Sequence, residues 1–559
     1  MGFRFPPWLF YCIVMRVFSF FFAYFLAFHL LIGQNTFSYR FDFGFPAVVL
    51  TSIVATDSCF YSTGIIADSI PPFNTGNIFV KFSLDGQVLI AKTLKDTLKT
   101  YETWRGNLAI VGPDRLAVSG NAKDGIRKDL LLVFNTQGDT LFSAGYPHPN
   151  YPEVTGTINR DFKKTEDGFV ILNYIKNPDG TGDTDIELSK LDTAGRFVWS
   201  QTFGITSRDD TPHNVIVAPD GYIIAAIRDN TNIVRQDYEA RNHIFKIDEQ
   251  GEVLWEYFSP VGELRGKEGR AIATSDGGLL VFTGQGVEVY VNPVTGQLRW
   301  HNYVFKLDSS RQEEWGVLVR DSLPAIPSVN QFSSAVELDG GEGYVVAGNL
   351  AEYHPDDSWH VGVLAKISPD GDLLWKRYYQ HIAGEGPRHY INDLAQAPDG
   401  GFIMAGEVRD TVNAPRQQGW LLKVDEYGCL VPGCELVSSV EEPKSSDDSH
   451  AFAEGFGSRR KSSDDCTLLL YPNPVAEALQ VYFTAPAGGE HHFRILDAQG
   501  REWRRFSTRL PASPDVAGHA GRSSEVTLLV EVDELPAGVY YLQYLREGKV
   551  VAMEGFVKR

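Results

Sequence analysis

Two short phrases recur in the same order along most of the chain, and this repetition constrains the fold more than any other feature. The first phrase is an acidic residue, usually followed by glycine, and then an apolar segment ending at glycine; Asp167-Gly168-Phe169-Val170 is one copy. The second is lysine, an apolar residue and Asp or Ser, then glycine and an aromatic residue, as in Lys190-Leu191-Asp192 with Gly195 and Trp199. Seven copies of the pair, some degraded, start 53 to 66 residues apart.

Each repeat predicts a four-stranded antiparallel sheet. The Asp-Gly pair is a tight-turn signal between two strands, and alternating runs such as Ile186–Leu191 indicate further strands around a second glycine turn. A single sheet of this kind cannot bury both of its faces, so neighbouring copies must stack. Radial stacking of such sheets makes a β-propeller, for which we predict seven four-stranded blades over residues 34–436. The repeated Gly, Trp and Lys positions are interpreted as structural, with Trp packing between blades.

The repeats resemble a large group of bacterial propeller repeats with the pattern DGGF…G…KLD..G…W…FG, which Trp199–Gly204 completes. Residues 37–44 resemble the end of a unit placed before the first one, so we expect them to supply the outer strand of the last blade and close the ring. Blade five stays ambiguous, because an extra Gly296-to-Trp300 echo and a 66-residue gap indicate either an inserted hairpin or a different register.

The first 33 residues have the features of a secretory signal peptide, with a start at Met15 as an alternative to Met1. Arg16 precedes an apolar run from Phe18 to Ile32, and Gly33 offers a small-residue exit. The alternative is a membrane anchor, but the unbroken apolar span is shorter than the roughly 20 residues that a bilayer requires. The formal net charge of −20 argues against nucleic acid as a partner, since phosphate binding needs clustered basic residues.

The cysteines fit an oxidising compartment. Cys429 and Cys434 flank a Pro-Gly turn, and we predict a local disulfide between them. Cys59 and Cys466 could pair only if the fold brings them together. A zinc half-site at Cys429 and Cys434 is disfavoured, because no second Cys/His pair has matching spacing.

The C-terminal part differs in composition from the repeats. Residues 437–466 are polar and rich in Ser and Asp, which predicts a disordered linker. Residues 467–559 contain six or seven short alternating segments, which predict a small β-sandwich. The complete prediction is therefore an all-β chain, with a propeller followed by a C-terminal sandwich.

The last segment resembles the type A C-terminal sorting domain of type IX secretion cargo. The residues that carry the likeness are Tyr471-Pro472-Asn473-Pro474, then Leu535, Gly538 and Tyr540, and the basic end Lys558-Arg559. The stretch from Leu510 to Ser524 is longer than the usual pattern, and we expect a loop there. The resemblance implies export by the outer-membrane type IX machinery, followed by release or by attachment to surface lipopolysaccharide. An accessory carbohydrate-binding or adhesion sandwich is the alternative.

Signals for catalysis are weak. No phosphate loop, HExxH or GxSxG motif is present. The best metal candidate is a calcium loop at Asp179, Thr181, Asp183 and Asp185, with oxygen ligands at alternate positions but no closing glutamate. No other cofactor is indicated. Because the repeat phrases place mostly apolar and small residues toward the channel, we expect a module that binds a glycan, peptide or protein; a hydrolase or lyase with its site in the channel is the alternative.

Overall fold

The structure is a computed structural model that describes residues 35–430 and 468–558. Short segments within these ranges are not described: 69–73, 97–98, 126, 147–157, 177–183, 206–207, 230–239, 261–264, 289–298, 320–327, 354–357, 383–386, 411–415, 472–474, 476, 487–488, 498–500, 511–522, 537 and 547–548. The predicted signal peptide, residues 1–33, and the predicted linker, residues 437–466, lie outside the described residues.

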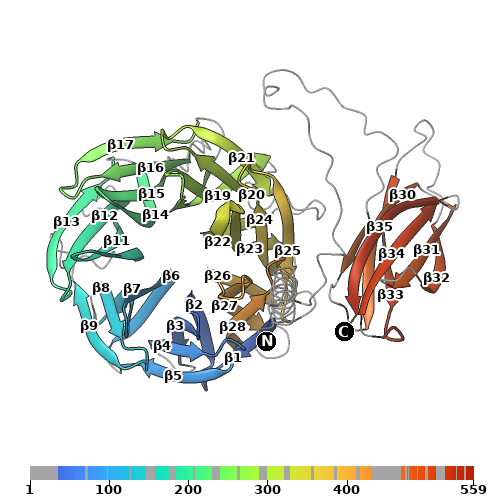
Figure 1. The fold of residues 1–559 in the computed structure, drawn as a ribbon, viewed down its shortest axis with the longest axis horizontal. Helices are drawn as coiled ribbons and strands as arrows, with labels where there is room; N and C mark the ends of the chain where they lie inside the picture. The colour runs from blue at the N-terminus through green and yellow to red at the C-terminus, as the bar shows by residue number, and fades with distance from the viewer. Residues whose placement is uncertain are drawn as a thin grey trace, which may run out of the picture.

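Strands β1 to β28 form seven four-stranded antiparallel sheets, the blades of a propeller arranged in a ring (Figure 1). Blades one and two comprise β2 (Ala47–Ala55), β3 (Phe60–Ala67), β4 (Thr75–Phe82), β5 (Val88–Leu94), β6 (Thr100–Gly112), β7 (Arg115–Lys123), β8 (Arg127–Phe134) and β9 (Thr140–Tyr146). Blades three and four comprise β10 (Ile158–Thr165), β11 (Gly168–Lys176), β12 (Thr184–Asp192), β13 (Phe197–Phe203), β14 (Asp209–Ala218), β15 (Gly221–Asp229), β16 (Arg241–Ile247) and β17 (Val253–Phe258).

The remaining blades follow the same order, from the inner strand to the outer one. Blades five and six comprise β18 (Arg265–Ala273), β19 (Leu279–Glu288), β20 (Arg299–Leu307), β21 (Glu313–Val319), β22 (Ser328–Glu337), β23 (Tyr344–Tyr353), β24 (Ser358–Ile367) and β25 (Leu373–Tyr379). Blade seven comprises β26 (Arg388–Gln396), β27 (Phe402–Asp410), β28 (Arg416–Val424) and, from the other end of the sequence, β1 (Phe37–Phe41).

Strand β1 closes the ring, as the sequence predicts. It pairs antiparallel with β28, from Phe37 opposite Lys423 to Phe41 opposite Gly419. Side chains reinforce the pairing: the indole N–H of Trp420 donates to the hydroxyl of Ser38 at 2.9 Å. The first and last parts of the propeller are thereby held in one sheet.

The repeated lysine binds the repeated acidic residue within its own blade. Lys190 and Asp167 lie 2.5 Å apart, Lys306 and Asp276 2.8 Å, and equivalent pairs occur in blades four, six and seven. The lysine side chain is almost fully buried in several blades, so it must have a charged partner, and the Asp-Gly turn supplies one. The two phrases recur together because they form one ion pair.

The repeated glycine and tryptophan pack neighbouring blades together, which confirms the structural interpretation. Gly371 has a φ of +90°, and a Cβ there would lie 2.6 Å from the Trp315 ring of the preceding blade. Trp315 also packs against Tyr344, with ring centroids 6.0 Å apart. Only glycine combines this backbone conformation with an aromatic ring lying directly on the turn.

Blade five has the ordinary register, because β19 and β20 pair from Leu279 opposite Leu307. Residues 289–298, which connect these two strands and account for part of the longer spacing, lie outside the described residues. The proposed inserted hairpin is therefore not described.

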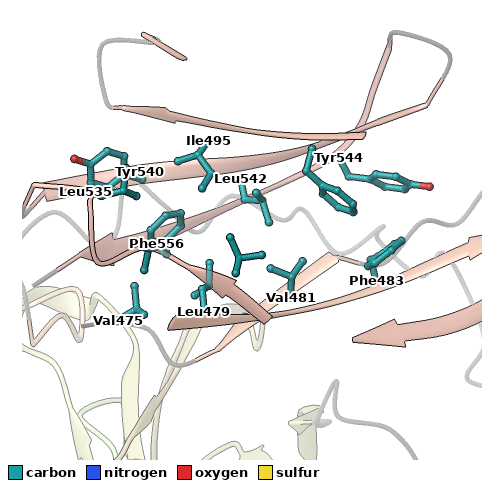
Figure 2. Close-up of a cluster of buried hydrophobic side chains, with 13 residues drawn as sticks. Val475, Leu479, Val481, Phe483, Ile495, Leu535, Tyr540, Leu542, Tyr544 and Phe556 are labelled. Carbon is teal, nitrogen blue, oxygen red and sulfur yellow. The ribbon is translucent and has the colours of Figure 1, made fainter. Parts of the chain in front are cut away.

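The C-terminal part is a β-sandwich of a three-stranded and a four-stranded sheet, in strand orders β29-β30-β33 and β32-β31-β34-β35. The strands are β29 (Leu468–Tyr471), β30 (Ala478–Pro486), β31 (Gly489–Asp497), β32 (Glu502–Leu510), β33 (Ser523–Glu531), β34 (Gly538–Arg546) and β35 (Lys549–Lys558). Figure 2 shows the core between the sheets, where alternate residues such as Leu479, Val481 and Phe483 point inward.

A short 3-10 helix, Asp339–Gly341, lies between β22 and β23. In the described part of the chain, no helix is long and apolar enough to cross a membrane. Cys59 is a buried free thiol. Cys429 is buried and forms a disulfide, while its predicted partner Cys434 lies outside the described residues.

Candidate ligand-binding channel

The innermost strands share an interruption in their pairing with the second strand of the blade. Pairing shifts by one residue in β2, β10, β14, β22 and β26, at Thr51, Arg160, His213, Ser333 and Asn392. Longer irregularities interrupt β6 and β18 at the equivalent place. A β-bulge redirects the side chains beside it. The bulges therefore redirect polar residues of the inner strands, which surround the axis of the propeller (Figure 1).

The residue after the bulge commonly binds the backbone of the next blade. The Asn214 amide donates to the carbonyl of Ala271 at 2.7 Å and accepts from its N–H at 2.9 Å. Asp161 likewise accepts the N–H of Val215 at 2.9 Å. These side chains satisfy backbone groups that no strand partner reaches, so they hold the blades in position.

A cavity of about 360 Å³ lies along the inner strands, with lining residues from six of the seven blades. Its volume is within the range of small-molecule sites. The charged side chains that line it are Asp161, Lys163, Lys164, Arg270 and Asp393, and Asn214, Ser333 and Ser334 add polar groups. The small residue Gly106 leaves open space: a Cβ built there would lie 3.6 Å from Nη1 of Arg270 and 3.8 Å from Oδ1 of Asp393.

Arginines from three blades gather beside this cavity. Burial lowers the pKa of Arg160, and the positive charges of Arg270 and Arg105 lower it further, while the carboxylate of Glu268 opposes them. Burial, together with the positive charges of Arg160 and Arg270, places the pKa of His213 well below its usual value, so that imidazole stays neutral. Arginine side chains and the carboxylate of Glu268 therefore lie close together in this part of the channel.

Glu268 lies at the irregularity of β18 with a φ of +49°. This left-handed conformation is uncommon for a residue other than glycine and costs on the order of 1 kcal/mol or more. The strained residue puts a carboxylate beside the arginines.

Both carboxylates that line the cavity have structural partners. Lys163 donates to Asp161 at 2.7 Å. Asp393 accepts the backbone N–H groups of Ile53 and Leu394, each at 2.9 Å, and the hydroxyl of Ser334 at 2.9 Å. Burial nevertheless raises the pKa of Asp393 to about 6, because its negative charge is removed from water. Asp161, through Val215, and Asp393, through Ile53 and Ser334, therefore join neighbouring blades.

The calcium candidate is only partly described. Asp179, Thr181 and Asp183 lie outside the described residues. Asp185 is buried in β12, opposite Ile175 of β11. Within the described part of the chain, no group of three or more His, Cys, Asp or Glu residues could hold a metal ion. The calcium site stays a prediction.

The sorting-domain residues that are described meet in and around the core at one end of the sandwich (Figure 2). Leu535 and Tyr540 are buried in the core, and the Tyr540 hydroxyl donates to the carbonyl of Pro536 at 2.9 Å. Gly538 pairs with Lys558, which also bridges to Val475. Tyr471 ends β29; Pro472, Asn473, Pro474 and Arg559 lie outside the described residues.

Apolar and small residues make up most of the cavity lining, as expected, but nearly all of them come from the inner strands and not from the repeat phrases. The apolar residues of the first phrase lie in the second strand of each blade, whereas the channel is lined by the inner strand before the phrase begins. A signal for the lining was present: Asp161, Asn214, Arg270 and Asp393 each stand six residues before the acidic residue that opens the first phrase. Polar residues recurring at that position mark the inner ring.

No protein-family model and no curated protein sequence matches this chain. Among solved structures, the extracellular region of plexin A4, domains 1 to 8, is 11% identical with a TM-score of 0.40, covering 94% of this chain and 62% of that one. A variant of the Synechocystis apocarotenoid oxygenase is 12% identical with a TM-score of 0.35, covering 71% of this chain and 95% of that one. The chain thus spans less than two thirds of the plexin structure. Strand pairing, independently of these likenesses, establishes the propeller.

Proposed function

We propose that this chain is an exported propeller that holds a ligand in its central cavity, at the cell surface or in the surrounding medium. The observation that carries the binding function is the cavity of about 360 Å³, to which six blades contribute. Such a cavity combines concave shape with a few polar groups, the combination that small-molecule sites use. The propeller is then the binding module, and its inner strands supply most of the cavity lining.

Binding is favoured over hydrolysis by the state of the two cavity carboxylates. A general acid or base needs a free position toward the substrate. Asp393 instead accepts three hydrogen bonds, and Asp161 bonds both Lys163 and the backbone of Val215. Their lone pairs are directed at the protein itself.

The export function rests on the sorting-domain resemblance of residues 467–559. In this proposal the outer-membrane type IX machinery recognises the C-terminal sandwich, and the propeller is afterwards released or attached to lipopolysaccharide. The clustering of Leu535, Tyr540 and Lys558 around one end of the sandwich supports a common recognition element built from distant parts of the sequence.

Export is tested by expressing the intact chain in a Gram-negative bacterium that has type IX machinery, beside a version ending at residue 466. We expect the intact chain on the surface or in the medium and the shortened chain in the periplasm. A matched strain lacking the outer-membrane translocon should retain the intact chain. Equal export of both chains, or export without the translocon, would contradict the proposal.

Binding is tested by screening the intact chain on an array of neutral and acidic glycans. The variant Ser334→Tyr places a large side chain in the cavity and is the matched comparison. We expect a ligand that the natural chain retains and the variant loses. Retention of every ligand by Ser334→Tyr, or no ligand for either chain, would count against a binding cavity.

A further inference from the structure

Arg270 is a charged cavity residue whose positive charge acts on the nearby carboxylate of Asp393. It is half-buried in β18, and no hydrogen bond or ion pair among the described residues includes it. Its Nε is buried and lacks a hydrogen-bond acceptor in the described part of the chain. The open space over Gly106 adjoins Nη1 instead, so a ligand in the cavity meets the guanidinium at Nη1 and not at the buried Nε.

The cavity lining carries one more positive than negative side chain, with Lys163, Lys164 and Arg270 against Asp161 and Asp393. Arg105 and Arg270 both lie close enough to Arg160 to lower its pKa. Lys164 lines the cavity from blade three. The complete chain, in contrast, has a formal net charge of −20. An excess of one positive charge in a recess of an acidic protein favours an anion over a neutral ligand there.

We infer that the cavity binds a small ligand with a carboxylate group, which Arg270 holds through its guanidinium. The inference rests on the proposed binding function and names the ligand class for it. A guanidinium presents paired donors that match the two oxygens of a carboxylate, and the open space over Gly106 adjoins its Nη1. A cavity of about 360 Å³ accommodates a single sugar acid.

The same cavity selects a single negative charge. Asp161 and Asp393 both line it, and a second charge on the ligand would lie near these carboxylates. Like charges in a partly desolvated site repel strongly. A monoanionic carboxylate is therefore a better ligand than a phosphate dianion of similar size.

The test is calorimetric titration of the intact chain with D-glucuronate, with D-glucose as the neutral comparison and D-glucose 6-phosphate as the dianion. We expect glucuronate to bind most tightly. Arg270→Gln should weaken its binding roughly 10- to 100-fold, the range of a charge-assisted pair. Arg270→Lys, which keeps the charge but loses the paired donors, should fall between the two.

The matched control is Arg196→Gln. Arg196 is exposed and bonds Asp192 in a turn of blade three, away from the cavity lining. It should leave glucuronate binding unchanged, and equal melting temperatures would show that both variants fold. No binding of glucuronate, or binding that Arg270→Gln leaves unchanged, overturns the inference.

Two results separate this inference from the binding function. A neutral glycan that is lost on Ser334→Tyr but retained by Arg270→Gln overturns the carboxylate inference and leaves the cavity as a binding site. Loss of every ligand-dependent signal, for acidic and neutral compounds alike, removes both.

Discussion

At the scale of single residues, Asp393 joins three blades through its hydrogen bonds. It belongs to blade seven, accepts the N–H of Ile53 in blade one, and accepts the hydroxyl of Ser334 in blade six. It does so while buried, with a pKa raised to about 6. The free energy needed to bury this carboxylate is therefore spent in blade seven, the blade that closes the ring.

The raised pKa makes stability depend on pH in a definite direction. An aspartate in the unfolded chain has a pKa near 3.9, so between about pH 4 and pH 6 the folded chain binds more protons at Asp393. This contribution stabilises the fold at low pH and is lost as the pH rises through about 6. In chemical denaturation, the advantage of the natural chain over Asp393→Asn should fall by about 1 kcal/mol from pH 5 to pH 7. If the difference in unfolding free energy between the two chains stays constant or grows with pH, Asp393 is not the group whose titration lowers stability.

The turn glycines allow a second test at the residue scale. Gly371→Ala combines a φ of +90° with a contact of 2.6 Å to Trp315. Gly125 has a similar φ of +99°, but a Cβ there would meet nothing within 4 Å. We expect Gly125→Ala to cost about 1 kcal/mol, from backbone strain alone, and Gly371→Ala a further 1–3 kcal/mol from overpacking. Similar losses in both variants would mean that blade packing tolerates the change.

Among the elements, β1 joins the two ends of the propeller by pairing with β28. Phe37 is 6% exposed and packs in the core of blades one and seven. Phe37→Ala should cost about 3 kcal/mol, because it leaves a cavity where the two ends of the propeller meet. Phe197→Ala is the matched control, because Phe197 is 43% exposed on an outer strand and should cost well under half as much. Equal changes in the unfolding midpoint of the intact chain would contradict this role of β1.

The elements were largely predictable, whereas the cavity was not. Asp-Gly turns, alternating strands and the unit fragment at residues 37–44 are local patterns, and local hydrogen bonding and packing fix their outcome. The contacts that form the cavity join distant residues: Asp393 binds Ile53, 340 positions away. Such pairings depend on ring closure and on bulges, and the periodicity of one strand encodes neither.

At the scale of the whole molecule, two parts with different chemistry share one chain. The C-terminal sandwich has an apolar core and carries residues that resemble an export signal, while the propeller collects arginines inside a protein of net charge −20. An acidic exterior repels anions in general, so selective capture requires that the cationic groups lie in a recess. The carboxylate ligand proposed for Arg270 connects this charge distribution to a function.

The position of a bound carboxylate tests this account most directly. A crystal structure of the intact chain with D-glucuronate should place the ligand in the cavity along the inner strands. We expect its carboxylate oxygens within about 3 Å of the Arg270 guanidinium nitrogens, the distance of a charge-assisted hydrogen bond. A ligand bound outside the cavity, or a carboxylate turned away from Arg270, would contradict the account.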